Sequence, residues 1–249
     1  MTADTGEYGT VRGDRAPAEI IGGAPSGRPV PHLTVAVARA GGTGILGLGA
    51  DRAPVLAALA DVRRWWTGPF GVRVPLGCRI RAAEIPPAAR TVVVDAPALH
   101  SDDWLAVAGF ARGRRLLIEA ADPAEAADAL RIGRGLTEDV GIIARDGGRP
   151  EDPTAFVLLQ MLLAEVDAPV YAAGGIGPHT AAAAVAGGAA GIVLDEQLAF
   201  VREAEPSGPG PAPAGLPGTV LAHRYKTAGG VVQAVREQIV LHLRAAVRA

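Results

Sequence analysis

A short apolar run recurs eight times between residues 19 and 201, and a helix-like segment follows most of these runs. The runs are rich in Val and Ile and end in Gly, Pro or Asp. Most are continuously apolar rather than alternating, which is typical of parallel strands buried on both faces. The predicted strands are residues 19–21, 44–48, 70–74, 91–95, 115–119, 140–144, 170–173 and 191–194.

The intervening segments are rich in Ala, Leu and Arg and predict helices. Asp122-Pro123 and Asp152-Pro153 each place an N-cap acid before a proline at the first helical position. Residues 77–90 are too interrupted by proline to form a full helix. The predicted helices are residues 31–40, 54–65, 102–111, 123–132, 153–165 and 179–187.

Eight strand units joined by short connections predict an α/β fold, a (β/α)8 TIM barrel that is trimmed because its segment is shorter than the usual ~250 residues. The alternative is a doubly wound open sheet. The predicted organisation is a flexible N-terminal arm (residues 1–18), the barrel (19–202), a Pro/Gly linker (203–218) and a C-terminal amphipathic helical segment (219–249). Val231, Val235, Ile239, Leu243 and Val247 recur at helical spacing in this last segment, which either packs back on the barrel or connects to another domain or partner.

Composition excludes several classes of protein. Apolar residues make up 49% of the 249, which excludes overall disorder, and the formal net charge of −2 favours neither nucleic acid nor an anionic membrane surface as a partner. The single cysteine, Cys78, excludes a disulfide framework and a multi-cysteine metal site. No uncharged run approaches the ~20 residues of a membrane helix, and the polar N-terminus lacks a signal peptide's apolar stretch. We therefore expect a cytoplasmic globular protein.

Glycine is concentrated where the carboxyl ends of the predicted strands meet their loops, which is where parallel barrels place their active sites. The clearest example is Gly174-Gly175-Ile176-Gly177, which follows the seventh strand and precedes a helix. Backbone N–H groups of such a loop approach a phosphate closely, and the helix N-terminus adds a favourable dipole. This segment predicts a phosphate-binding loop.

Several motifs resemble the nitronate monooxygenase (2-nitropropane dioxygenase-like) flavoproteins. They are Pro69-Phe70-Gly71-Val72, the earlier run over residues 40–47, and residues 172–176 followed by 181–191, in matching order across about residues 19–205. The family consists of FMN-dependent TIM barrels and includes enoyl reductases that serve polyunsaturated fatty acid and polyketide synthases. GGIGPHTAAAAVAGGAAGIVLDEQLAF and TAFVLLQMLL are most similar to the barrel domain at the N-terminus of some polyketide synthases.

The resemblance implies an FMN site made by three loops. It assigns Ala24, Pro25 and Ser26 to the loop beneath the flavin ring, Gly147 and Gly148 to the loop beside it, and Gly174, Gly175, Ile176 and Gly177 to the FMN phosphate.

This chain departs from the family at three places. Arg149 stands where the family has its catalytic histidine, and Arg73 stands where the family has asparagine after Pro-Phe-Gly-Val. The pair Asp195-Glu196 replaces the Gly-Thr that closes the phosphate site. Arg149 cannot act as a base at neutral pH, because a guanidinium stays protonated.

Structural roles compete with functional ones at each charged residue. Arg73 either offsets the acids of the eighth strand or pairs with Glu119, and Arg149 either holds an anionic or acyl group or pairs with a neighbouring aspartate. His179 is a weak candidate for a proton donor, because a histidine at a helix N-terminus is more often a surface or capping residue. No metal site is predicted.

Three functions follow as hypotheses. The first is an FMN-dependent oxidoreductase domain that acts on acyl chains in a polyketide or fatty-acid assembly line, with an acyl carrier protein or a ketosynthase as partner. The second is a degenerate, flavin-free barrel kept as a structural or docking domain. The third is a barrel that binds another anionic ligand through Arg149 and Arg73. A homodimer is compatible with all three.

Overall fold

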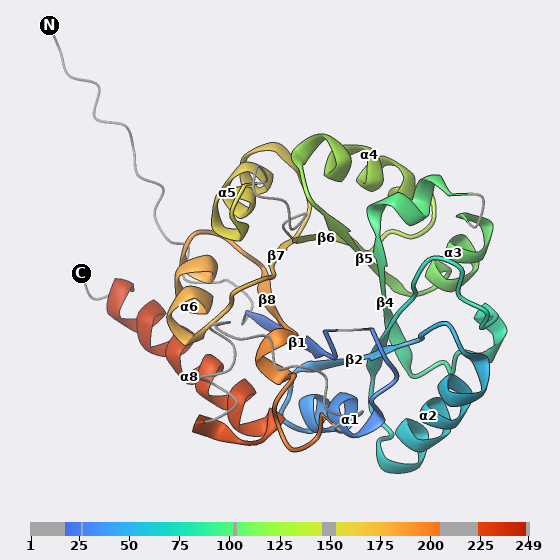
Figure 1. Ribbon diagram of the computed structural model, residues 1–249. Coiled ribbons are helices and arrows are strands. Elements are labelled where there is room, and N and C mark those ends of the chain that lie inside the picture. Colours follow the sequence, from blue (N-terminus) through green and yellow to red (C-terminus); the bar gives the residue numbers. More distant parts are fainter. Residues whose placement is uncertain (1–17, 26, 102–103, 146–152, 205–223, 248–249) are drawn as a thin grey trace, which may run out of the picture.

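In the computed structural model, eight parallel strands close into a barrel (Figure 1). The structure describes residues 18–25, 27–101, 104–145, 153–204 and 224–247. Each strand pairs with the next, and β8 closes the ring on β1 with Gly191 opposite Glu19. The strands are β1 (Glu19–Gly23), β2 (Thr43–Gly47), β3 (Phe70–Arg73), β4 (Ala89–Asp95), β5 (Arg115–Ala120), β6 (Val140–Ala144), β7 (Val170–Ala172) and β8 (Gly191–Leu194). All eight predicted strands are confirmed, and the closed ring excludes the open sheet.

Helices surround the barrel (Figure 1). Residues 74–88, all of which the structure describes, contain only the short 3-10 helix η1, as the prolines in this connection predict. The Asp122 N-cap is also confirmed, since its carboxylate accepts the Glu125 N–H at 2.8 Å. The helices are α1 (Pro31–Arg39), α2 (Arg52–Trp65), α3 (Trp104–Ala111), α4 (Pro123–Arg134), α5 (Ala155–Glu165), α6 (Pro178–Ala186) and α8 (Ala228–Val247), with 3-10 turns η1 (Ala82–Glu84), η2 (Ala96–His100) and η3 (Glu196–Leu198).

The barrel interior is filled by side chains, as expected for eight strands. Its apolar cluster comprises Ile21, Ile45, Val93, Leu117, Ile143, Tyr171, Ala173 and Val193. β3 contributes a glycine, Gly71, where an added Cβ would lie 2.4 Å from the Ile45 side chain. A second, larger apolar cluster lies between the strands and the helices.

A polar cluster lies at the amino ends of the strands. Glu19 accepts hydrogen bonds from Thr43 (2.6 Å), Arg115 (2.7 Å) and the Tyr171 hydroxyl (3.1 Å). Burial raises the pKa of Tyr171 to about 12, with Arg115 opposing the shift and Glu19 adding to it. These contacts lie opposite the end where the loops predicted to be functional meet, so we assign them to stability.

The C-terminal helix α8 packs back on the barrel. It lies against α6 and α1, and Val231, Val235 and Ile239 are buried. Arg236 donates to the carbonyls of Ala40 and Gly41, both at 2.9 Å, and so binds the carboxyl end of α1. Most of the predicted linker and the whole predicted arm except residue 18 lie outside the described residues. None of the helices described combines the length and apolar character needed to cross a membrane.

Replacing Ile239 with alanine should lower the free energy of unfolding by about 3 kcal/mol, because it removes buried methyl and methylene groups and leaves a cavity between α8 and the barrel. Urea unfolding followed by circular dichroism measures this. Leu241→Ala is the matched control on the same helix: Leu241 is largely exposed, so its loss should stay within about 0.5 kcal/mol. Equal losses in the two variants would contradict the packing of α8.

Candidate functional site

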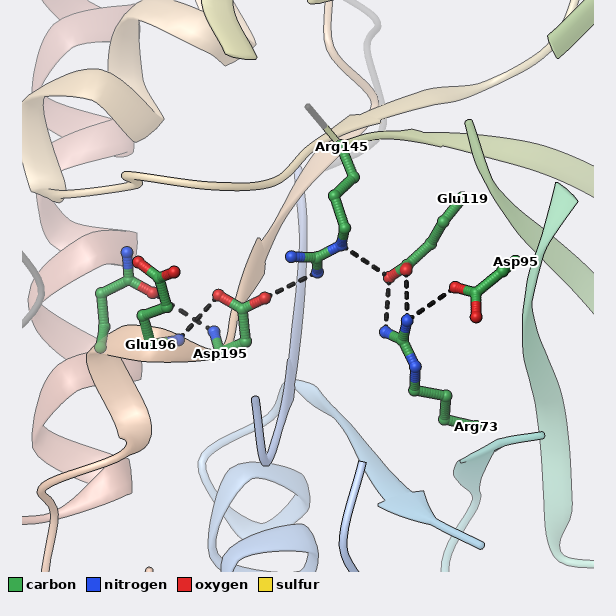
Figure 2. A network of polar contacts seen from close by, with 7 residues as sticks. Arg73, Asp95, Glu119, Arg145, Asp195 and Glu196 are labelled. Carbon is green, nitrogen blue, oxygen red and sulfur yellow. Dashed lines mark hydrogen bonds and ion pairs between the residues drawn. The ribbon is translucent and has the colours of Figure 1, made fainter. Parts of the chain in front are cut away.

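Five charged side chains meet at the carboxyl end of the barrel (Figure 2). Arg73 ends β3, Asp95 ends β4, Glu119 lies near the end of β5, and Arg145 and Asp195 directly follow β6 and β8. They form an unbroken series of ion pairs in the order Asp95, Arg73, Glu119, Arg145, Asp195. We call these five residues the mouth network. It contains two guanidinium groups and three carboxylates.

Arg73 holds the first half of the mouth network. Its Nη1 and Nη2 donate to the two carboxylate oxygens of Glu119 at 2.7 and 2.5 Å, and Nη2 also donates to Asp95 at 2.8 Å. Such a bidentate arginine–carboxylate pair is among the stronger charged contacts in proteins. The predicted pairing of Arg73 with Glu119 is confirmed, and Arg73 does not reach the acids that follow β8.

Arg145 holds the second half. Its Nε lies 3.1 Å from Glu119 Oε1, and its Nη2 lies 2.6 Å from Asp195 Oδ2. Burial lowers the pKa of Arg145, but the charges of Asp195 and Glu119 more than offset this, so its pKa is raised. Glu119 is only 5% exposed and Asp195 is also buried. Arg145 therefore neutralises two buried carboxylates at once.

A small cavity of about 30 Å³ lies beneath the mouth network. Four of the five network residues line it, all except Asp95, together with Ala24 and Pro25 of the predicted flavin loop and the apolar side chains of Ile21, Ile45 and Val93. This volume is about that of one water molecule in the liquid. Among the described residues, the space beside these charged side chains is therefore about that of one water molecule.

The loop after β8 satisfies its own backbone. Asp195 Oδ1 accepts the Glu196 N–H at 2.7 Å, and the side-chain oxygen of Gln197 accepts the Asp195 N–H at 3.2 Å. Figure 2 shows the Glu196 carboxylate on the far side of Asp195 from Arg145. Asp195 therefore both pairs with Arg145 and caps the turn that follows it.

The loop after β7, which the sequence predicts to bind a phosphate, contains two glycines in the left-handed region of backbone conformation. Gly174 and Gly175 have φ of +80° and +58°, a region that favours glycine, and a Cβ on Gly175 would meet nothing within 4 Å. Ile176 is buried, and the Gly177 N–H donates to the Thr180 hydroxyl at 2.6 Å at the start of α6. Of the three predicted flavin loops, this is the one most completely described.

The other predicted site residues fall in two groups. Ser26, Gly147, Gly148 and Arg149 lie outside the described residues. His179 is exposed at the start of α6, where its ring lies edge-on to His242 of α8 with centroids 6.0 Å apart, and it does not line the cavity at the mouth. This arrangement agrees with a surface role for His179.

Arg145 is the residue that sequence reasoning missed. Its position directly after a strand was visible, but no role was assigned to it. The available signal was the series of charges at the ends of the strands, where Arg73, Asp95, Glu119, Arg145 and Asp195 occupy equivalent positions.

No protein-family model and no curated protein matches this chain. Among solved structures, FabK from Thermotoga maritima is 25% identical with a TM-score of 0.59; the match covers 76% of this chain and 61% of FabK, less than two thirds of its length. A mutant of the same FabK matches at 21% identity over 93% of this chain and 94% of that one, with a TM-score of 0.62. Nitroalkane oxidase from Streptomyces ansochromogenes is 20% identical, with a TM-score of 0.67 over 91% of this chain and 97% of the other.

The closed parallel ring with outer helices defines the chain as a (β/α)8 TIM barrel with a C-terminal helix. The likenesses to FabK and nitroalkane oxidase agree with the family resemblance of the sequence. These comparisons show the barrel fold.

Proposed function

We propose that this chain is an oxidoreductase-like barrel that does not bind flavin and serves as a structural or docking domain in a polyketide or fatty-acid synthase. The observation that carries the proposal is the mouth network, which lies beside the loop that the resemblance assigns to the flavin ring. Ala24 and Pro25 of the predicted ring loop line the same small cavity as Arg73, Glu119 and Arg145.

The space at the mouth does not fit FMN. Pockets for small molecules and cofactors have volumes of roughly 300–1,000 Å³, about ten times or more the 30 Å³ found here. A flavin ring could enter only if Arg145 or Arg73 left its partners. That would leave Glu119 buried without its counter-ions, which is energetically costly.

The charge at the predicted phosphate site also opposes FMN. The carboxylate of Asp195 lies in the loop that the family uses to close this site, and the amides of Asp195 and Glu196 already donate to side chains of the same loop. A carboxylate about 4 Å from a phosphate oxygen costs on the order of 4 kcal/mol at an effective dielectric constant near 20. The loop after β8 therefore offers a carboxylate where the resemblance implies glycine, and the ion pair of Asp195 with Arg145 offsets part of its repulsion of a phosphate.

A second candidate is the FMN-dependent oxidoreductase that acts on acyl chains. The loop over Gly174–Gly177 favours it, since its positive φ angles and the open space at Gly175 suit a phosphate. The third hypothesis, an anion bound through Arg149 and Arg73, is less well supported, because the guanidinium of Arg73 is already engaged by Glu119 and Asp95. Arg149 lies outside the described residues. We therefore rank the flavin-free barrel first.

The synthase context rests on the sequence resemblance. Residues 174–200 and 154–163 are most similar to the barrel domain at the N-terminus of some polyketide synthases. In that setting an acyl carrier protein or a ketosynthase is the partner that we propose. Helix α8 packs on α6 and α1 and is therefore part of the barrel domain.

The visible absorption spectrum tests the proposal. We expect the purified protein to be colourless, and we expect it to retain no FMN after incubation with excess FMN and removal of the free cofactor on a desalting column. The reasons are that the side chains of the mouth network leave too little space for a flavin ring and that Asp195 places a negative charge at the predicted phosphate site. A yellow protein with one FMN per chain would overturn the flavin-free reading and restore the second candidate.

A further inference from the structure

Two histidines face each other across helices α6 and α8. His179 is the second residue of α6 and His242 lies near the end of α8; their ring centroids are 6.0 Å apart, with an angle of 74° between the ring planes. The two helices pack side by side on the outside of the barrel (Figure 1), which fixes the positions of the two backbones. Both imidazoles are exposed, so a ligand from solvent can reach them.

Neither imidazole has a carboxylate as its partner. His100 pairs with Asp128 at 3.1 Å, whereas His179 and His242 make no ion pair in the part of the chain that the structure describes. Helix α6 itself has no charged side chain. A neighbouring carboxylate favours the protonated form of a histidine, but a metal ion binds the neutral form. The surroundings of this pair therefore suit a metal ion.

The contacts of His242 determine which of its nitrogens is available. Its Nδ1 lies 3.1 Å from the backbone carbonyl oxygen of Gln238 and 2.9 Å from the side-chain Nε2 of the same residue. Nδ1 is thus engaged on its own helix, and Nε2 is the nitrogen left for a metal ion. A metal ion on Nε2 leaves the ring proton on Nδ1, where the Gln238 carbonyl accepts it. Metal-binding histidines are usually oriented by such a hydrogen bond from the second ring nitrogen.

The distance between the two rings fits one shared ion. Zinc lies about 2.0–2.1 Å from an imidazole nitrogen, so two imidazoles on one zinc ion have centroids about 5–6 Å apart. The centroids of His179 and His242 are 6.0 Å apart without any ion. Exposed side chains change rotamer within nanoseconds. The two rings can therefore turn toward a common ion while both helices stay in place.

We propose that His179 and His242 form a surface site for Zn²⁺, with water molecules as the remaining ligands. The described residues contain no group of three or more His, Cys, Asp or Glu side chains that could hold a metal ion, so the protein supplies two ligands here. Catalytic and structural zinc sites have three or four protein ligands, and we therefore expect reversible binding. The bound ion would fasten α8 to α6. This inference goes beyond the proposed function and does not depend on flavin binding.

Zinc should stabilise the folded chain. The two histidines meet only when α8 packs on α6, so the unfolded chain binds zinc less tightly. At a free zinc concentration about a hundred times the dissociation constant, the equilibrium constant of unfolding should therefore fall about a hundredfold. Titration calorimetry with zinc chloride in a non-coordinating buffer should give one ion per chain. Urea unfolding with and without zinc chloride measures the stabilisation.

Phenylalanine variants separate metal binding from packing of the two rings. His179→Phe and His242→Phe each keep an aromatic ring at the contact but remove the nitrogens that bind a metal ion. Each should weaken zinc binding by about tenfold or more, and most of the stabilisation by zinc should be lost. Without zinc, both variants should unfold at nearly the same urea concentration as the unmodified protein, because the contact between the rings remains.

His100→Phe is the matched control, since it removes another exposed imidazole, the one that pairs with Asp128. It should bind zinc as the unmodified protein does. Three results would overturn the proposal: an unmodified protein that binds no zinc, a His179→Phe or His242→Phe protein that binds zinc as tightly as the unmodified one, or an equal loss of binding in His100→Phe.

Discussion

Replacing Arg145 with alanine should lower the free energy of unfolding by about 3–5 kcal/mol, the cost of leaving one partner of a buried ion pair without the other. Arg145 lies between Glu119 and Asp195, which are both buried. Arg73 would still compensate Glu119, but Asp195 has no second ion-pair partner in the described part of the chain. Most of the loss should therefore come from Asp195. Urea unfolding at neutral pH measures it.

Two further variants separate charge from geometry. Arg145→Lys keeps the positive charge but has a single ammonium group, so it cannot reach Glu119 and Asp195 in the two directions that Nε and Nη2 serve. We expect an intermediate loss. Arg131→Ala is the control for removing an arginine from an exposed pair with Asp128, and its effect should be far smaller. Similar losses for Arg145→Ala and Arg131→Ala would show that the mouth network does not stabilise the fold.

The strands were predictable because parallel strands buried on both faces leave a continuous apolar run. The ends of the strands were less predictable. β1 extends two residues beyond the predicted strand 19–21, through Gly22 and Gly23. In the barrel these glycines lie where a Cβ would approach Val37 and Leu198, or the backbone of Ile45, within about 3 Å. Here glycine marks close packing inside a strand rather than a turn.

A helix start shows the same limit. α2 begins at Arg52, two residues before the predicted start at Pro54. Proline is tolerated in the first turn of a helix, because the N–H that it lacks has no intrahelical partner there. A proline therefore limits the start of a helix to within a turn and does not fix the first residue.

The candidate site was predictable one residue at a time but not as a network. The pair of Arg73 with Glu119 was one of two alternatives that the sequence allowed, because both residues lie at strand ends and carry opposite charge. Arg145 and Asp195 follow β6 and β8, and β7 lies between these strands in the ring. Whether two such side chains meet depends on how the barrel closes and on whether the side chains are long enough to span the distance. The local sequence does not determine that distance.

Restoring the family's residues after β8 should restore FMN affinity. The double variant Asp195→Gly with Glu196→Thr removes both carboxylates from the predicted phosphate site. At about 4 Å and an effective dielectric constant near 20, the repulsion between an unpaired carboxylate and a phosphate is worth on the order of 4 kcal/mol, or nearly three factors of ten in affinity. The ion pair of Asp195 with Arg145 makes this an upper limit. The double variant also frees the backbone N–H of residue 196, which now donates to the Asp195 carboxylate. It leaves Arg145 Nη2 without the Asp195 carboxylate as its ion-pair partner.

We therefore expect FMN to bind the double variant at least tenfold, and up to about a thousandfold, more tightly than the unmodified protein. Titration of FMN fluorescence measures both affinities. The upper limit requires Arg145 to turn toward the phosphate, and the lower limit applies if it stays on Glu119 and continues to fill the ring position. Adding Arg145→Ala to the double variant separates these cases. If Arg145 binds the phosphate, its removal weakens FMN binding. If Arg145 fills the ring position, its removal strengthens FMN binding.

A matched control separates the local charge from the net charge. Glu138→Thr with Asp139→Gly removes the same two negative charges from an adjacent acid pair at the amino end of β6, next to Arg115 rather than the mouth network. If Asp195 and Glu196 exclude FMN by their position, this control should bind FMN no better than the unmodified protein. Equal gains in both double variants would show that the whole charge of the chain governs affinity. No gain in either would show that the guanidinium groups at the mouth, rather than the acids after β8, keep the flavin out.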